Sequence, residues 1–347
     1  MFRSRQVARC FRGYGTYTCA VSQRPRVRLL AVGGTISCVP REGVEGVTAA
    51  LTAADIAESV PGLADVAELD VGDVATVASF DVTYALMLAV AREVVRARAE
   101  SCDAVVVTHG SDTIEETAYA LALMLPRGAP VVLTGAMRNP TLPGTDGPAN
   151  LLAATIVAAS PEAGELGPVI VFNDEVHAAR FAQKLHTTRV STFGSLGAGP
   201  VGEVVEGRAH LWFRPAWEDH VGLPEELDGT TVELVEIAAD PAETTLRAAA
   251  ERRPAGIVIA GTGGGHVPTR LLPALDDALA AGIPVVVASR TPSGRNLEST
   301  YGMPGGESDL IRRGALPAGF LTPQKARLRL AVGLAVGRPP AELFPVR

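Results

Sequence analysis

The sequence predicts an α/β protein of two doubly wound domains, a larger N-terminal one and a smaller C-terminal one, with mostly parallel sheets. Short apolar runs of strand character alternate with segments of helical periodicity along most of the chain, which is the pattern of βαβ units. A segment rich in proline, tryptophan and acidic residues, 214–229, interrupts this alternation once. The length of 347 residues suits two domains. We therefore expect an N-terminal domain over 27–213 and a C-terminal domain over 230–347.

The elements of the larger domain follow one another in order. Its first strand is an apolar run that ends at two glycines, Val27–Val32. Further strands are expected at Ala104–Thr108, Pro130–Thr134 and Pro168–Phe172. Helices are expected at Thr52–Glu58 with Thr52 as N-cap, at Val82–Ala99, from about Ile114, and at Pro148–Ala158. Glycines and valines indicate hairpin-like strands between about Thr187 and Phe213.

The smaller domain repeats the alternation on a reduced scale. Strands are expected at Val232–Ile237, Gly256–Ala260 and Ile283–Ser289. Helices are expected at Glu243–Arg252, Pro268–Ala281 and Thr322–Gly337. A loop rich in glycine, Gly261–His266, follows the middle strand.

The N-terminus differs from the rest of the chain. Seven arginines and no acidic residue fall within residues 1–28. We expect a disordered basic extension over 1–26, with a basic contact arm as the alternative. A secretory signal needs an apolar central stretch, and these residues contain none, which favours a cytoplasmic protein.

Composition excludes several classes of function. The formal net charge of −7 and the 5% of aromatic residues argue against nucleic-acid binding, which needs clustered basic side chains. No stretch approaches the ~20 apolar residues of a membrane span. The four cysteines form no CxxC pair and the six histidines are dispersed, so we expect reduced thiols and no metal site.

Two clusters of small hydroxyl residues stand at the ends of predicted strands. Thr35 follows Gly33 and Gly34, which leave its hydroxyl uncrowded, and such a hydroxyl acts as a nucleophile only beside a base. The alternative is a turn in which Thr35 or Ser37 caps the next segment. Because the carboxyl ends of parallel strands share one edge of a sheet, we expect the two clusters to meet there.

The second cluster, Ser111 and Asp112, lies where a strand passes into a helix, whose free N–H groups can stabilise an oxyanion. The structural alternative is a capping box, formed by Asp112 with Glu115 or by Thr113 with Glu116.

Two further candidates carry weaker signals. Lys184 lies among polar residues after a strand; it is either a proton-transfer group near an acid or a solvated surface lysine. The loop Gly261–Gly265 before a helix suggests a phosphate cradle, although it lacks the Lys-Ser/Thr ending of a P-loop. His266 at its end is either a loop histidine or a site residue.

Five motifs together resemble the bacterial-type L-asparaginase family. They are a GGTI box, an HGSDTIEET box, a GAMR segment, a K-x-x-T-T segment and a P-x-KAR helix start. They occur here in that order, at Gly33–Ile36, His109–Thr117, Gly135–Arg138, Lys184–Thr188 and Pro323–Arg327. The resemblance covers about residues 27–340.

This resemblance implies an amidohydrolase that hydrolyses the side-chain amide of L-asparagine, without metal or organic cofactor, through a threonine acyl-enzyme. The implied catalytic residues are Thr35, Ser111, Asp112 and Lys184. The implied substrate-binding residues are Ser79, Phe80, Gly110, Ser111, Asp112 and His266. The resemblance also implies a homo-oligomer, a dimer or a tetramer, in which the small domain of one subunit completes the site of another.

Departures from the family pattern leave alternatives open. Ser111 stands where threonine is usual, His266 stands where many relatives have asparagine, and the segment Ser37–Thr48 contains no tyrosine. A dual glutaminase–asparaginase is one alternative, because one methylene changes binding by only ~1–3 kcal/mol. A non-catalytic amino-acid-binding relative is a second, and a nucleotide-dependent enzyme that uses the glycine loop is a third.

Overall fold

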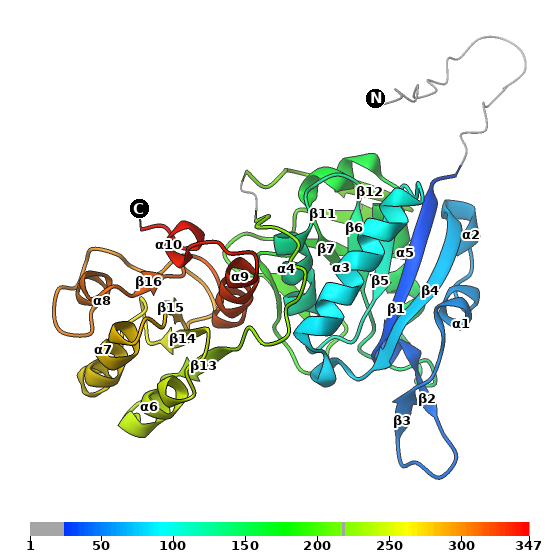
Figure 1. The fold of residues 1–347 in the computed structure, drawn as a ribbon. Coiled ribbons are helices and arrows are strands. Elements are labelled where there is room, and N and C mark those ends of the chain that lie inside the picture. Colours follow the sequence, from blue (N-terminus) through cyan, green and yellow to red (C-terminus); the bar gives the residue numbers. More distant parts are fainter. Residues whose placement is uncertain (1–23, 217–218, 347) are drawn as a thin grey trace, which may run out of the picture.

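An eight-stranded sheet organises the larger domain, in the order β12-β11-β8-β7-β6-β5-β1-β4 (Figure 1). The computed structural model describes residues 24–216 and 219–346. Five neighbouring strands are parallel: β4 (Glu68–Val77), β1 (Arg26–Gly33), β5 (Ala104–Thr108), β6 (Val131–Thr134) and β7 (Val169–Phe172). The remaining three are antiparallel: β8 (Glu175–Ala178), β11 (Gly202–Val205) and β12 (Arg208–Leu211).

Both faces of this sheet are covered, because alternate side chains of each central strand enter different cores. Leu30 and Val105 point into one core, together with α3 (Tyr84–Ala99) and α4 (Ile114–Met124). Leu29 and Val106 point into the other. The helices on that second face are α1 (Ala53–Glu58), α2 (Leu63–Val66) and α5 (Gly147–Ala158).

The smaller domain holds a four-stranded parallel sheet in the order β13-β14-β15-β16. The strands are β13 (Val232–Glu236), β14 (Gly256–Gly261), β15 (Val285–Ser289) and β16 (Leu316–Pro317). One face is covered by α6 (Glu243–Glu251), α7 (Leu272–Ala280) and α8 (Glu307–Arg313). The other is covered by α9 (Pro323–Ala335), with α10 (Pro340–Leu343) against it.

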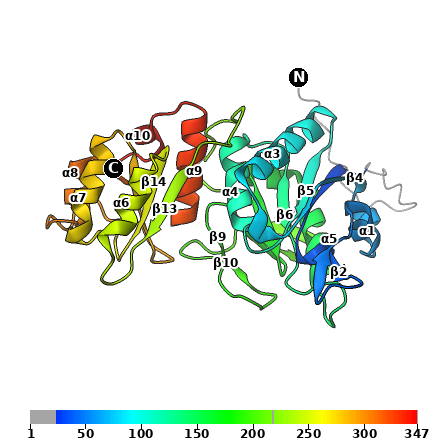
Figure 2. The same ribbon diagram turned by 60° about the horizontal axis from the view of Figure 1, so that its bottom comes forward.

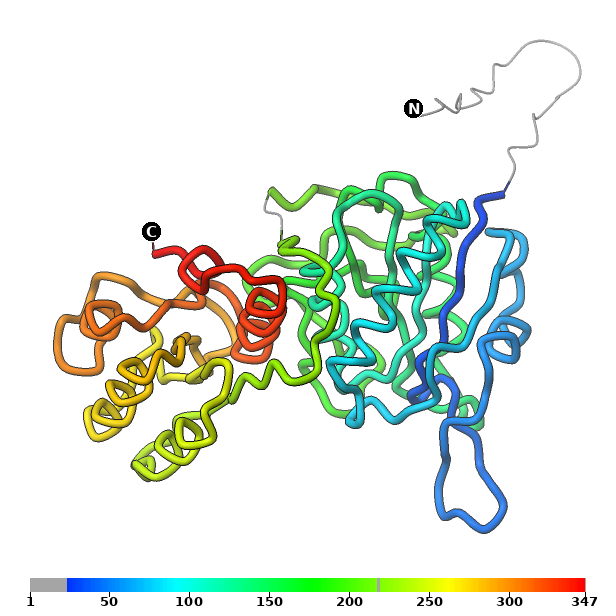
Figure 3. The backbone as a smooth tube through the Cα atoms, in the orientation of Figure 1, coloured from blue at the N-terminus to red at the C-terminus, as the bar shows by residue number. Residues whose placement is uncertain are grey.

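Helix α9 also packs on α4, so the apolar core beneath it continues into the larger domain. The chain crosses between the domains before β13, and its C-terminal segment, red in Figure 3, returns to the boundary. The two-domain, doubly wound α/β fold expected from the sequence is confirmed. None of the helices within the described ranges is long and apolar enough to cross a bilayer.

Two small antiparallel ribbons stand outside the large sheets. One follows β1 and a 3-10 turn, η1 (Thr35–Ser37), and pairs β2 (Cys38–Pro40) with β3 (Val47–Ala49). The other pairs β9 (Ala182–Lys184) with β10 (Phe193–Ser195) and lies between the domains (Figure 2).

Several elements differ from the expectations. Strand β4 was not expected, because its sequence alternates polar and apolar residues around Gly72, as suits an exposed edge strand. The helix expected from Val82 begins two residues later, with Thr83 as its N-cap. The predicted N-cap Thr52 is confirmed, and it forms a capping box with Asp55. Most of the predicted basic extension, residues 1–23, lies outside the described residues.

Candidate active site

The loops after three neighbouring strands meet at one edge of the large sheet. The Gly34 N–H donates to Val77 O at 3.1 Å, which joins the ends of β1 and β4. A Cβ atom on Gly34 would stand 2.2 Å from Gly110 Cα, and one on Gly110 would stand 2.6 Å from Ser79 Cβ. Only glycine fits at these two positions, and its absence of a side chain lets the three loops touch.

Four polar side chains from these loops and from β9 form one network. Lys184 Nζ donates to Ser111 Oγ at 2.8 Å and to Asp112 Oδ1 at 2.7 Å. Ser79 Oγ donates to Asp112 Oδ2 at 2.7 Å. Each carboxylate oxygen of Asp112 therefore has its own donor. The structure brings together Ser79, Gly110, Ser111, Asp112 and Lys184, as expected from the sequence.

The network lowers the pKa of Asp112 below its ordinary value, chiefly because the Lys184 ammonium donates a hydrogen bond to the carboxylate. Half of the Asp112 side chain is exposed, whereas Lys184 is 18% exposed. An anion fixed in this way at the mouth of the site can receive the cationic end of a ligand, with the ammonium of Lys184 held behind it.

The capping box considered for this segment is wrong. Helix α4 has Thr113 as its N-cap residue, and no side chain caps it. Thr113 Oγ1 instead donates to Ser79 O at 2.6 Å. The Asp112 carboxylate is engaged by Ser79 and Lys184, and that of Glu115 accepts the N–H of Lys184. Side chains that sequence spacing assigned to capping therefore serve the site.

Thr35 is half-buried and begins the turn η1, directly after Gly34. Ser37 Oγ and Cys38 Sγ both donate to Gly34 O, at 2.8 and 3.3 Å, so these residues close the turn. Gly34 and Gly110 are in backbone contact, and Thr35 and Ser111 are the next residues of these two loops.

A buried histidine, which the sequence did not single out as a site residue, supports the loop after β5. His109 Nδ1 lies 2.7 Å from Gly110 O, and Nε2 lies 3.0 Å from Thr117 Oγ1. Burial lowers the pKa of His109 to about 4, so the ring is neutral at neutral pH and bonds to both partners. The only signal in the sequence was its place just before Gly110.

Two predicted binding residues do not join the network. Phe80 follows Ser79 in the chain, but its side chain is 75% exposed. His266 belongs to the smaller domain, where Nε2 lies 3.2 Å from Glu307 and the ring packs edge-on against Tyr301.

The glycine loop does not offer a phosphate cradle. The N–H groups of Gly265 and His266 both donate to Thr262 O, at 3.0 and 2.8 Å, and so close the loop on itself. A Cβ on Gly264 would stand 2.7 Å from Leu297, so side chains fill the space around the loop. Phosphate loops bind through free backbone amides, and these two are occupied.

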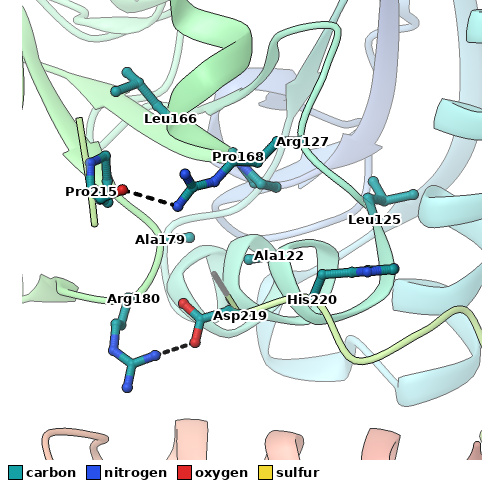
Figure 4. Close-up of a pocket in the computed structure, with 12 residues that line it drawn as sticks. Ala122, Leu125, Arg127, Leu166, Pro168, Ala179, Arg180, Pro215, Asp219 and His220 are labelled. Atoms are coloured by element: carbon teal, nitrogen blue, oxygen red, sulfur yellow. Dashed lines mark hydrogen bonds and ion pairs between the residues drawn. The ribbon is translucent and has the colours of Figure 1, made fainter. Parts of the chain in front are cut away.

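A small hollow near the domain boundary is separate from this network (Figure 4). It encloses about 30 Å³, room for one or two water molecules and too little for an amino acid. Within it Arg180 pairs with Asp219, and Arg127 donates to Pro215 O. Over residues 24–216 and 219–346, no group of three or more His, Cys, Asp or Glu side chains is placed to hold a metal ion.

Comparison with known proteins agrees with the geometry. The family model described as asparaginase, N-terminal, matches residues 26–217, and the one described as glutaminase/asparaginase C-terminal domain matches 231–344. A probable L-asparaginase of Deinococcus radiodurans is 39% identical over 90% of this chain and 94% of its own length. A glutaminase-asparaginase of Pseudomonas aeruginosa is 33% identical, over 91% of this chain and 88% of its own.

A solved structure is also similar. The probable cytoplasmic L-asparaginase from Campylobacter jejuni superposes with a TM-score of 0.83 at 30% identity, over 92% of this chain and 98% of the other. A relative from Haemophilus influenzae, 32% identical over 94% of each chain, is called a probable periplasmic L-asparaginase. Relatives of this chain are thus named for both compartments.

Proposed function

The chain belongs to the asparaginase family of amide hydrolases, and from this premise we propose that it converts L-asparagine and water to L-aspartate and ammonia through an ester on Thr35. One observation carries the proposal: the Lys184 ammonium donates to both Ser111 and Asp112. These two residues belong to the loop that contacts Gly34 through Gly110. It supports a nucleophile at Thr35, a proton path through Ser111 and Lys184, and a carboxylate at Asp112, all near one edge of the sheet.

The chemistry divides into two steps with water as the only co-substrate. Thr35 Oγ1 attacks the side-chain amide carbon, and the Lys184 ammonium donates a proton to the departing nitrogen. The threonine proton passes through the Ser111 hydroxyl to Lys184 and restores the ammonium. A C–O bond forms, the C–N bond breaks, and ammonia leaves. Water then attacks the ester, the C–O bond to Thr35 breaks, and a proton of that water restores the threonine hydroxyl.

The carboxylate and hydroxyl groups match the ends of a zwitterionic amino acid. We assign the α-ammonium to Asp112, whose side chain is half exposed. We assign the α-carboxylate to the Ser79 hydroxyl beside Gly110, which turns from Asp112 to donate to the ligand. A ligand that lacks either group loses that charged contact and binds more weakly. Phe80 and His266 are assigned to the rim of the site.

A dual glutaminase–asparaginase is the second candidate, since one relative carries that name. Ammonia release from L-asparagine, L-glutamine and their D-isomers separates the candidates. We expect the highest kcat/KM with L-asparagine. Equal values for the two L-amides favour the dual enzyme. Binding without ammonia release identifies an amino-acid sensor and contradicts the proposed hydrolysis.

We further propose a homodimer or a dimer of dimers. The exposed Phe80 and the position of His266 outside the network support a site completed by a second subunit. Light scattering coupled to size exclusion tests this assignment, and a monomer with full activity contradicts it. A cytoplasmic location stays a prediction.

A further inference from the structure

Helix α9 carries a lysine that is completely buried at the domain boundary. Lys325 is 0% exposed, and its Nζ donates to Ala182 O at 2.5 Å and to Arg180 O at 3.2 Å. Both carbonyls belong to the larger domain, and Ala182 is the first residue of β9. A side chain of the smaller domain therefore holds the main chain two residues before Lys184.

A carboxylate holds the same strand from the opposite domain. The Lys184 N–H donates to Glu115, which lies in the first turn of α4, just after Ser111 and Asp112. The Lys184 main chain and its ammonium are thus both bound to the segment 111–115. The charges of Glu115 and Lys325 attract each other.

The burial of Lys325 is costly and calls for a reason. An apolar residue of similar volume packs a helix interface without the loss of hydration that an ammonium suffers. Burial lowers the pKa of Lys325 to about 8, so at neutral pH the group is still largely protonated and donates to both carbonyls. Both of its side-chain hydrogen bonds go to the segment 180–182, which leads into β9.

We propose that Lys325 and Glu115 are positioning residues for Lys184: they fix β9 from the two domains so that the Lys184 amine meets Ser111 and Asp112. β9 has only three residues and one ribbon partner, β10, so its own pairing is a weak constraint. A displacement of ~1 Å at a reacting group costs on the order of 100-fold in rate. This inference rests on the proposed function.

The test compares a variant that removes the hydrogen bonds to the segment 180–182 with a variant on the same helix that leaves them in place. In Lys325→Met the side chain stays long and unbranched, one atom shorter, but loses its charge and its donors. Arg329→Met is the matched control, because Arg329 lies on the same helix and bonds Leu343 O and Asp219 instead of β9. We expect kcat for asparagine to fall about tenfold or more in Lys325→Met with KM within about twofold, and to stay within about twofold in Arg329→Met.

A second variant serves if Lys325→Met does not fold. Glu115→Leu removes the acceptor of the Lys184 N–H, whereas Glu115→Gln keeps an acceptor oxygen. We expect the leucine variant to lose kcat as Lys325→Met does, and the glutamine variant to recover part of it. Equal kcat in the leucine variant and the wild type overturns the proposal, as does an equal loss in Lys325→Met and Arg329→Met.

Hydrogen exchange separates this inference from the proposed function. The amide of Lys184 exchanges slowly if Glu115 holds it, and faster in Lys325→Met and Glu115→Leu but not in Arg329→Met. A wild type that releases no ammonia contradicts the hydrolase proposal alone when this exchange pattern holds. Unchanged protection in both variants contradicts the positioning role, whatever the activity.

Discussion

The charge balance of the site depends on the carboxylate of Asp112. One oxygen accepts from Lys184 and the other from Ser79, so the side chain is held although half of it is exposed. The Lys184 ammonium also stabilises the ionised form of Asp112, so that this carboxylate at the start of α4 resists protonation. The same carboxylate remains available to a ligand cation.

Replacement of Lys184 by methionine should raise the pKa of Asp112, because the hydrogen bond from Lys184 is the main cause of its lowered value. In the wild type the Asp112 carboxylate stays ionised at pH values at which an ordinary aspartate is already protonated. The stability that comes from its pairing with Lys184 is lost only when the pH falls through this lowered pKa. Carbon-13 NMR titration of the Asp112 carboxyl measures both pKa values. The same midpoint in wild type and Lys184→Met contradicts the assigned cause.

The contact between Gly34 and Gly110 can be tested with a closely matched pair. Gly34 and Gly46 have φ values of +84° and +88°, but a Cβ on Gly34 meets Gly110 Cα at 2.2 Å and one on Gly46 meets nothing within 4 Å. Gly34→Ala should therefore lose activity and about 2 kcal/mol or more of unfolding free energy. Gly46→Ala should lose only ~1 kcal/mol. Urea unfolding and ammonia release measure both. Equal effects would show that backbone strain, and not the contact, limits the position.

The residues of the hydrogen-bonded network could be named from the sequence, but the residues that hold them in place could not. Ser111 and Asp112 lie next to each other at a strand end, and the resemblance joined Lys184 to them. Glu115 was interpreted as a capping residue, because its partner Lys184 lies 69 positions away. Lys325 reaches a carbonyl 143 positions distant, and no local pattern reports such a contact.

At the scale of elements, buried central strands were the easiest to predict. β5 and β14 are unbroken apolar runs, and their bounds agree within one residue. β4 and β9 were missed because an edge strand alternates polar residues and a three-residue ribbon has no periodicity. These two elements contribute the loop of Ser79 and the lysine of the site, so the least regular strands carry functional groups.

Strand β8, which lies inside the eight-stranded sheet, gives a stability prediction. Burial lowers the pKa of His177, on this strand, to about 4 from 6.5. As the pH falls from 6.5 to 4 the unfolded chain takes up this proton first, so the unfolding free energy falls across that window. Between pH 7 and 5 the loss is about 2 kcal/mol from this residue.

His177→Gln should remove that part of the pH dependence. Urea unfolding at pH 7 and pH 5 measures it, with His210→Gln as the control, since His210 is exposed on β12. A slope unchanged in His177→Gln, or reduced as much in His210→Gln, would mean that the fall in stability originates elsewhere.

At the scale of the whole molecule, α9 makes the two domains one packed unit. Leu328 and Val332 of this helix lie in the same core as Leu121 of α4, and the sheet of the smaller domain packs on its other side. The sequence predicted two domains from the break in alternation. It did not predict that a terminal helix would share the core of both, because amphipathic periodicity shows that a face is buried but not against what.

Assembly is the prediction at this scale. We expect a homodimer or tetramer whose activity per subunit falls on dilution below the dissociation range, since we propose that a second subunit completes the site around the exposed Phe80. Phe80→Asp places a charge on this 75% exposed side chain and should shift the equilibrium toward smaller species. Light scattering at several concentrations measures it, with Val44→Asp, on the exposed hairpin tip, as the control. Constant specific activity and size across dilution would contradict the assembly.

The most direct measurement is a mass analysis of the peptide that contains Thr35 after rapid acid quench of the protein with L-asparagine. The proposed mechanism predicts one aspartyl group on Thr35 in the first turnover, absent from Thr35→Ala. Ammonia release without any modification, an aspartyl group on Ser111 instead, or full turnover in Thr35→Ala would contradict it.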